Sequence, residues 1–144
     1  MPGMRTLLLA AILAAGCTKA DPTPAPAPAP APVKSSTIPL VTVDEVDASI
    51  AKHEATPVDA NGDSTRKHMG VLPGAVLLTD SDGYDISELP ADKTKSLVFY
   101  CGNDACSASH HAAKKALAAG YEHVRVMPSG IAGWVSAGKQ VQQI

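Results

Sequence analysis

Short apolar segments alternate with helix-like segments throughout residues 39–144, and this alternation restricts the fold more than any other feature of the sequence. Apolar runs of only a few residues suit strands that are buried on both sides. Because strands that alternate with helices pair in parallel, we expect an α/β fold in which a small parallel sheet, of about five strands, carries helices on both faces. The expected strands are Pro39–Val43, Thr56–Asp59, Ala75–Leu78, Leu97–Tyr100 and Val124–Val126, and the expected helices are Asp44–His53, Asp63–Met69, Ser109–Ala119 and Gly130–Ala137.

Residues 1–16 have the pattern of a bacterial export signal. Arg5 precedes an apolar run from Leu7 to Ala15, which is too short to span a bilayer core of about 30 Å as a helix. The small residues before Cys17 resemble a bacterial lipobox, in which the cysteine is lipidated. We therefore expect a lipoprotein held in the cell envelope by Cys17 and facing the periplasm. Thr18, which follows it, favours the outer membrane. Ordinary secretion with an unmodified Cys17 is the alternative.

Residues 17–38 separate this cysteine from the predicted domain at residues 39–144. From Pro22 to Pro32, proline alternates with small residues. Each proline fixes φ and lacks a backbone donor, so the segment forms neither a helix nor a sheet ladder. We expect a semi-rigid spacer between the membrane and the domain.

Composition excludes two classes of protein. A net charge of −2 with 3% aromatic residues provides neither the basic surface nor the stacking platform that nucleic-acid binding requires. The absence of a second long apolar run excludes a protein with several membrane spans. We expect one domain that is monomeric.

One strand-to-helix junction carries reactive chemistry. Cys101 follows the most apolar strand, and a loop leads from it to the next helix. Loop amides and a helix N-terminus both stabilise negative charge, and the thiolate is the nucleophilic form of cysteine. Gly102 and Asn103 permit the unusual backbone angles that a ring of amides needs. The pattern favours a reactive Cys101 over a buried structural one.

Several motifs resemble the rhodanese family, in family order and over nearly the whole of residues 39–144. They are Val58-Asp59-Ala60, Gly70 to Ala75, Val98 to Cys101, Ser109 to Leu117 with Gly120-Tyr121, and Gly130 to Trp134 with Ala137-Gly138.

The resemblance implies a sulfurtransferase in which Cys101 takes a sulfane sulfur from a small donor, forms a persulfide, and passes the sulfur to a thiol or another nucleophilic acceptor. It implies no cofactor and no metal. The loop is then the substrate-binding cradle, formed by Gly102, Asn103, Asp104, Ala105, Ser107, Ala108 and Ser109.

The sequence departs from the family pattern at two positions. The loop is two residues longer than usual when Ser109 is aligned with the family serine, and Ala108 then replaces an arginine. Asn61 stands where many members have another arginine. Because arginine clamps anions, these departures weaken the case for thiosulfate as the donor. Asp59 matches an acidic position near the family site, although it equally suits capping the turn at Asn61-Gly62.

Cys106 places a second thiol in the same loop. It is expected to resolve a persulfide or sulfenic acid on Cys101 by forming a disulfide, or alternatively to staple the loop. His110 is a candidate for lowering the Cys101 pKa. A metal held by both cysteines with His110 or His111 is disfavoured, because the spacing matches no standard zinc pattern. Thiol–disulfide exchange or redox sensing by Cys101 and Cys106 remains an alternative function, as does a non-catalytic binding module.

Overall fold

The computed structural model describes residues 37–144. The predicted signal peptide, Cys17 and most of the spacer lie outside the described residues. Among the helices that are described, none has the length and apolar character needed to cross a membrane.

The described chain alternates helices and strands as the sequence predicts. The helices are α1 (Val43–Ala51), α2 (Asp63–Met69), α3 (Ala108–Ala118) and α4 (Gly130–Ser136), and the strands are β1 (Thr56–Asp59), β2 (Val76–Leu77), β3 (Ser96–Tyr100) and β4 (His123–Met127). A short 3₁₀ helix at Ile86–Glu88 was not predicted.

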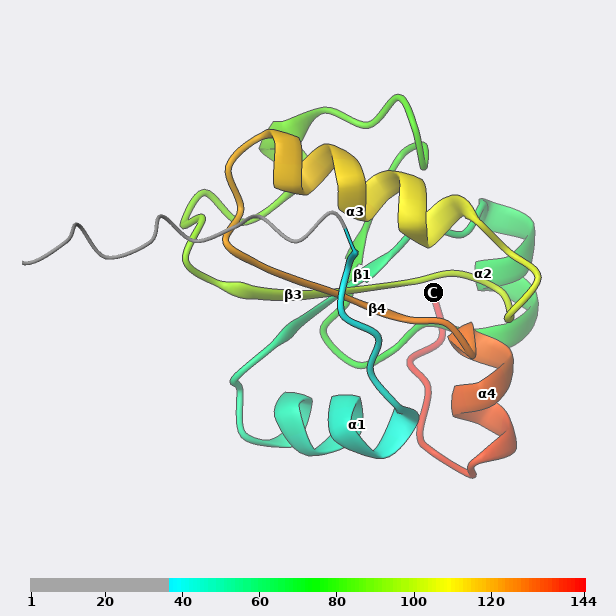
Figure 1. The fold of residues 1–144 in the computed structure, drawn as a ribbon. Coiled ribbons are helices and arrows are strands. Elements are labelled where there is room, and N and C mark those ends of the chain that lie inside the picture. Colours follow the sequence, from blue (N-terminus) through cyan, green and yellow to red (C-terminus); the bar gives the residue numbers. More distant parts are fainter. Residues whose placement is uncertain (1–36) are drawn as a thin grey trace, which may run out of the picture. The chain divides into compact units, whose positions relative to one another are not determined.

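The four strands form one parallel sheet in the order β2-β1-β3-β4. Figure 1 shows β1, β3 and β4 between α3 on one side and α1 on the other. Within the sheet, Val58 pairs with Phe99, and Phe99 pairs with Val126. Because all strands run the same way, their carboxyl ends meet at one edge of the sheet. This edge is where ligands bind in open α/β folds.

The α/β prediction is confirmed, but the sheet has four strands rather than about five. The expected first strand is reduced to one isolated bridge between Leu40 and Val126. Its two hydrogen bonds run from Val41 N–H to Val126 O at 2.9 Å and from Val126 N–H to Pro39 O at 3.0 Å. Pro39 lacks an N–H, and Thr42 already caps α1, so too few residues remain for a ladder.

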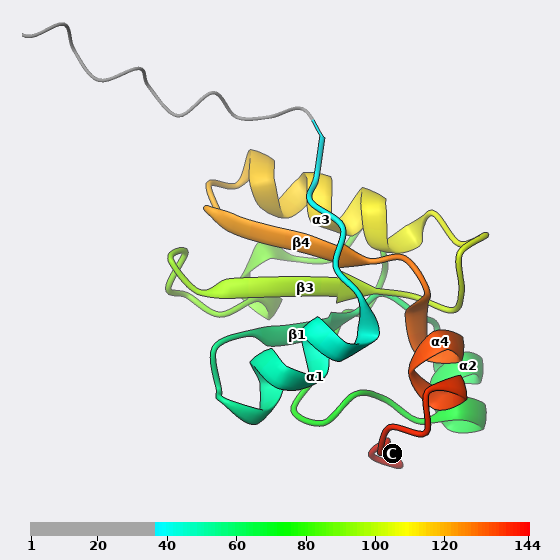
Figure 2. The same cartoon turned by 60° about the horizontal axis from the view of Figure 1, so that its bottom comes forward.

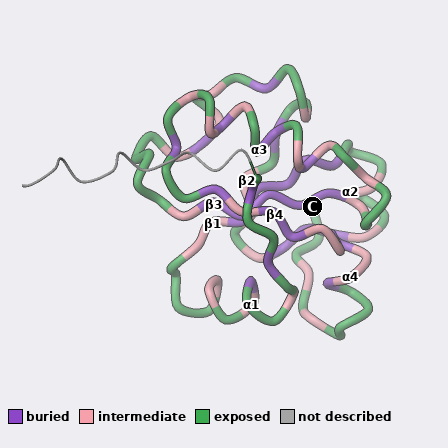
Figure 3. The backbone as a smooth tube through the Cα atoms, viewed as in Figure 1, coloured by how far each residue is buried: buried purple, intermediate pink, exposed green. Residues whose placement is uncertain are grey.

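The core lies on both faces of the sheet, beneath α3 on one side and beneath α1 and α4 on the other (Figure 2). Leu97, Phe99 and Cys101 pack with the alanines of α3, whereas Val98 and Tyr100 pack with Trp134 of α4. The two central strands, β1 and β3, are buried at every residue but the first (Figure 3). This alternation places the Cys101 side chain on the α3 side of the sheet.

Candidate active site

Cys101 lies at the carboxyl edge of the sheet, immediately after β3. The N-terminal end of α4 holds the backbone at this point. Ile131 N–H donates to Cys101 O at 2.8 Å, and Ala132 N–H donates to Gly102 O at 2.9 Å. The start of the loop is therefore fixed by hydrogen bonds from a helix that follows it by about thirty residues.

Gly130 makes this close approach possible. A Cβ at this position would collide with the carbonyl oxygen of Cys101 and the carbonyl group of Gly102, and its φ of +59° disfavours other residues. The glycine of the predicted tail motif thus packs directly against the candidate site.

Cys101 and Cys106 form a disulfide across the loop, with their Cα atoms 6.3 Å apart. Cys101 is buried, and Cys106 is partly exposed. The Cys101 sulfur lies 3.3 Å from the carbonyl oxygen of Cys106 and 3.4 Å from the Ser109 hydroxyl. Ser109 is itself buried in the first turn of α3. The structure therefore brings together three of the predicted site residues, Cys101, Cys106 and Ser109.

The predicted ring of amides around an accessible sulfur is wrong for this disulfide form. Asn103 O accepts a hydrogen bond from Cys106 N–H, and Asn103 Oδ1 accepts one from Ala105 N–H, both at 3.0 Å. Two amides of the turn are therefore hydrogen-bonded within the turn, and the carbonyl oxygen of Cys106 lies next to the Cys101 sulfur.

The rest of the predicted loop is more open. Asn103, Asp104, Ala105 and Ser107 are exposed, and Gly102 and Ala108 are partly buried. Within the described chain, the N–H groups of Gly102, Asn103 and Asp104 donate to no protein atom. The N–H groups of Ser107, Ala108 and Ser109, at the start of α3, likewise donate to no protein atom of the described residues. These unpaired amides are the part of the predicted cradle that stays available to an anion.

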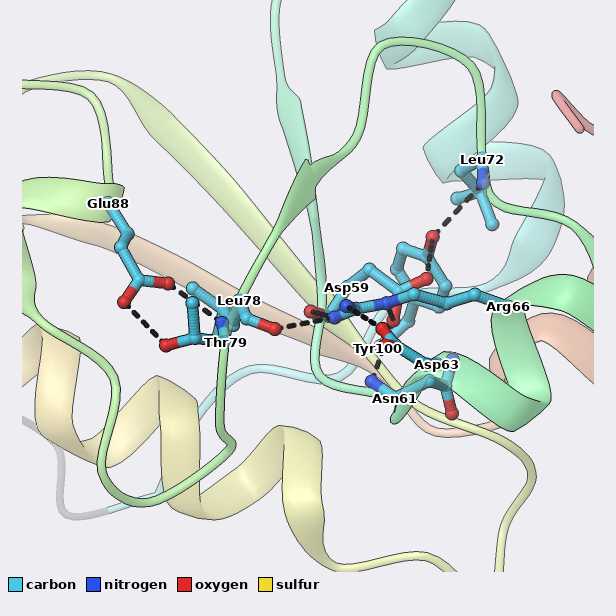
Figure 4. Close-up of polar contacts among 9 residues, drawn as sticks. All are labelled: Asp59, Asn61, Asp63, Arg66, Leu72, Leu78, Thr79, Glu88 and Tyr100. Carbon is cyan, nitrogen blue, oxygen red and sulfur yellow. Dashed lines mark hydrogen bonds and ion pairs between the residues drawn. The ribbon is translucent and has the colours of Figure 1, made fainter. Parts of the chain in front are cut away.

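Asp59 ends β1 as the centre of a buried polar network (Figure 4). Its Oδ1 accepts from Asn61 N–H at 2.6 Å and pairs with Arg66 Nε at 3.3 Å. Its Oδ2 accepts from the Tyr100 hydroxyl at 2.6 Å. The carboxylate caps the turn, as the alternative interpretation expected, and it touches neither cysteine. Asp59 therefore supports the site by holding its backbone.

Two residues of this network were missed by sequence reasoning. Arg66 is buried and donates through Nη2 to Asp59 O at 3.0 Å and Leu78 O at 2.7 Å. Tyr100 accepts from Leu72 N–H at 3.0 Å, and its burial, followed by the Asp59 charge, raises its pKa. No sequence pattern around Arg66 or Tyr100 indicated this role, because an arginine in a short helix and a tyrosine in a strand are both common.

Asn61 adjoins both the network and the loop. Its Nδ2 atom is buried and has no hydrogen-bond partner among the described residues. Its Oδ1 lies 3.7 Å from the place that a Cβ on Gly102 would take. The sequence marked Asn61 only as a departure from the family pattern.

Neither of the two histidines at the start of α3 forms a hydrogen bond or ion pair with the cysteines in the described chain. His111 Nδ1 is 3.1 Å from Asp82 Oδ1, on an exposed face. The His110 side chain makes no polar contact with Cys101 or Cys106 in the part of the chain that is described. The proposed influence of His110 on the thiol therefore has no support from this geometry.

Residues 42–137 match the family model described as Rhodanese-like domain. A comparison with curated proteins gives no match. Among solved structures, a protein from Bacillus halodurans superimposes with a TM-score of 0.64 at 20% identity, covering 73% of this chain and 77% of that one.

Two further solved structures share the fold. The rhodanese-like domain from an Anabaena protein has a TM-score of 0.61 at 21% identity, with 75% of this chain and 81% of that chain covered. A thiosulfate sulfurtransferase from Pseudomonas aeruginosa has a TM-score of 0.61 at 22% identity. That match covers 74% of this chain but only 20% of the Pseudomonas chain.

Proposed function

Because this chain belongs to the rhodanese-like domain family, we propose that it transfers sulfane sulfur through a persulfide on Cys101. The observation that carries the proposal is the placement of Cys101 at the carboxyl edge of the sheet, bonded to Cys106 and next to the Ser109 hydroxyl. A buried hydroxyl beside a sulfur stabilises the negative charge that develops there. Cys101 is then the nucleophile.

The disulfide is the resting form in this proposal, so the first step is its reduction. A dithiol reductant donates two electrons, becomes a disulfide itself, and leaves Cys101 and Cys106 as thiols. The Cys101 thiolate then attacks the outer sulfur of a donor R–S–SH. A bond forms between that sulfur and Cys101, and R–S⁻ leaves.

The Cys101 persulfide can react in two ways. A thiolate acceptor attacks the outer sulfur, becomes a persulfide and regenerates the Cys101 thiolate. Alternatively, the Cys106 thiolate attacks the inner sulfur, restores the disulfide and releases HS⁻. The second reaction assigns Cys106 the resolving role.

The charges around the loop favour a donor of low charge. No lysine or arginine of the described chain forms a hydrogen bond or ion pair with residues 101–109, and Asp104 adds a negative charge there. A thiosulfate dianion gains least from such a site, since anion clamps are normally cationic. We therefore propose an alkyl persulfide as the donor class.

Mass spectrometry of the full chain after reduction tests the proposal. Exposure to an alkyl persulfide is expected to add one sulfur atom to the Cys101 peptide, and Cys101→Ser is expected to abolish this gain. Cys106→Ser is expected to retain the gain and to prolong its lifetime, because the resolving thiol is absent. No sulfur on Cys101 with any sulfane donor would refute the proposal.

Thiol–disulfide exchange without sulfur transfer is the second candidate, and the disulfide itself favours it. This function predicts a reversible disulfide that requires both cysteines and reduces a partner's disulfide in turn. If the reduced protein exchanges with a model disulfide but never carries extra sulfur, its function is thiol–disulfide exchange rather than sulfur transfer.

We propose that the protein resides in the cell envelope, with lipidated Cys17 as the membrane anchor and the Pro22 to Pro32 segment as the spacer. Mass spectrometry of the membrane-extracted protein is expected to show acyl chains on Cys17, and an unmodified Cys17 would refute the anchor.

A further inference from the structure

We propose that Asn61 donates a hydrogen bond from Nδ2 to the negatively charged sulfur group at Cys101 once the disulfide is open. The inference rests on the proposed function for the identity of that group, first a thiolate and then a persulfide. It assigns to this neutral side chain part of the anion binding that a cationic residue would otherwise provide.

The Asn61 amide is incompletely paired in the disulfide form. The residue is 9% exposed, and Nδ2 is the one buried side-chain nitrogen or oxygen without a hydrogen bond in the described part of the chain. Burying an unpaired donor is unfavourable, so such groups call for an explanation. A ligand that binds after the loop opens supplies the missing acceptor.

The backbone holds Asn61 against the start of the Cys101 loop. Asn61 N–H donates to Asp59 Oδ1 at 2.6 Å, and Ala60 N–H donates to Tyr100 O at 2.9 Å, one residue before Cys101. On the loop side, Asn61 Oδ1 lies 3.7 Å from the place of a Gly102 Cβ. The side-chain amide thus lies next to the residue that follows Cys101, with Oδ1 on the loop side. A rotation of about 180° around χ2 exchanges Oδ1 with Nδ2, so the proposal requires this rotation when the disulfide opens.

Other unpaired donors belong to the same loop. The amides of Gly102, Asn103 and Asp104 have no protein partner in the described chain. Arg66, the nearest cation in the network, is already paired with Asp59 and Asp63. The available donors are therefore all neutral, which suits a singly charged persulfide better than a dianion.

The test uses the full chain carrying Cys106→Ser, so that Cys101 stays reduced. Asn61→Leu keeps the branched outline of the side chain, at a larger volume, and removes the donor. Asn61→Asp keeps both shape and volume but replaces the donor by a carboxylate. Alkylation of Cys101 by iodoacetamide is followed against pH at the level of the Cys101 peptide, and thermal unfolding reports whether each variant remains folded.

Loss of the donor is expected to raise the apparent Cys101 pKa by about one unit in Asn61→Leu, and further in Asn61→Asp, because a charge-assisted hydrogen bond to the thiolate disappears. The rate of persulfide formation from an alkyl persulfide at neutral pH is expected to fall about three- to fourfold, since a tenfold lower thiolate fraction is partly offset by the higher nucleophilicity of a thiolate with a higher pKa. Both effects are expected in folded variants.

An alkylation profile that is unchanged in a folded Asn61→Leu or Asn61→Asp protein would overturn the inference. That result leaves sulfur transfer itself intact, provided that the parent still gains sulfur on Cys101. Conversely, a parent that gains no sulfur refutes the proposed function, whereas the alkylation profile still decides whether Asn61 contacts the charged thiolate.

Discussion

The Tyr100 hydroxyl donates a 2.6 Å hydrogen bond to Asp59 Oδ2, and so ties the residue before Cys101 to the end of the neighbouring strand. The same carboxylate binds Asn61 N–H and pairs with Arg66 (Figure 4). One buried acid therefore sets the positions of both the reactive strand end and the Asn61 amide.

Asp59→Asn is expected to destabilise the protein by about 3–5 kcal/mol, because it leaves the buried Arg66 guanidinium without its main counter-charge. Tyr100→Phe is expected to cost less, about 1.5–3 kcal/mol, since it removes hydrogen bonds but leaves the ion pair. Urea unfolding of both variants measures the difference. A smaller loss for Asp59→Asn than for Tyr100→Phe would contradict the central role of the carboxylate.

Ser109→Ala is expected to slow persulfide formation on Cys101 roughly tenfold, because the hydroxyl 3.4 Å from the sulfur stabilises its negative charge. Ser107→Ala is the matched control, since Ser107 is exposed and its side chain makes no capping hydrogen bond. Quenched time courses of the reduced proteins, analysed by mass spectrometry, give the rates of both variants. Equal slowing in the two variants would show that Ser109 has no specific role.

Gly130→Ala is expected to disturb the candidate site beyond the effect of its backbone angle. Gly138 has a similar φ of +71° but nothing within 4 Å of its virtual Cβ, so Gly138→Ala measures the conformational cost alone, about 1–2 kcal/mol. Gly130→Ala adds a collision with the carbonyls of Cys101 and Gly102.

The two alanine variants are compared by thermal unfolding and by the rate at which a dithiol reduces the Cys101–Cys106 disulfide. Only Gly130→Ala is expected to change the reduction rate, because only Gly130 touches the loop. Identical behaviour of the two variants would exclude close packing between α4 and the site.

Stability is expected to decline between about pH 10 and pH 12. Burial, followed by the nearby Tyr121 and Glu88, raises the pKa of Tyr84 to about 12 from its ordinary value of 10. Above pH 10 the unfolded chain releases this proton while the folded chain keeps it, so the stabilisation is complete below pH 10 and is lost as the pH rises through 12.

Tyr84→Phe is expected to make this alkaline decline shallower, as measured by urea unfolding at successive pH values. The slope does not vanish, since the pKa of the buried Tyr100 is raised as well. An unchanged slope in Tyr84→Phe would contradict the assignment. The variant also loses the hydrogen bond from the Tyr84 hydroxyl to Ala112 O at 2.8 Å, so its stability at neutral pH is expected to be lower throughout.

The sequence by itself determined the fold class and the place of Cys101 directly after a buried strand. Apolar periodicity is a local property, and it located β1 and α2 at their observed residues and β3 within one residue of its start. The prediction of the first strand failed for two reasons. The apolar pattern of Pro39–Val43 does not show that α1 already starts at Val43, and the lack of an N–H on Pro39 was not weighed against it.

Only the tertiary structure decided how the candidate site is closed and supported. Asp59 and Tyr100 are 41 residues apart, and Arg66 reaches the carbonyl of Leu78 across 12. The orphaned amide of Asn61 and the contact of Gly130 with the loop likewise depend on elements that meet only after folding. Such contacts arise from the pairing of distant strands and the packing of helices on them. The periodicity of the sequence does not indicate which side chains that packing brings together.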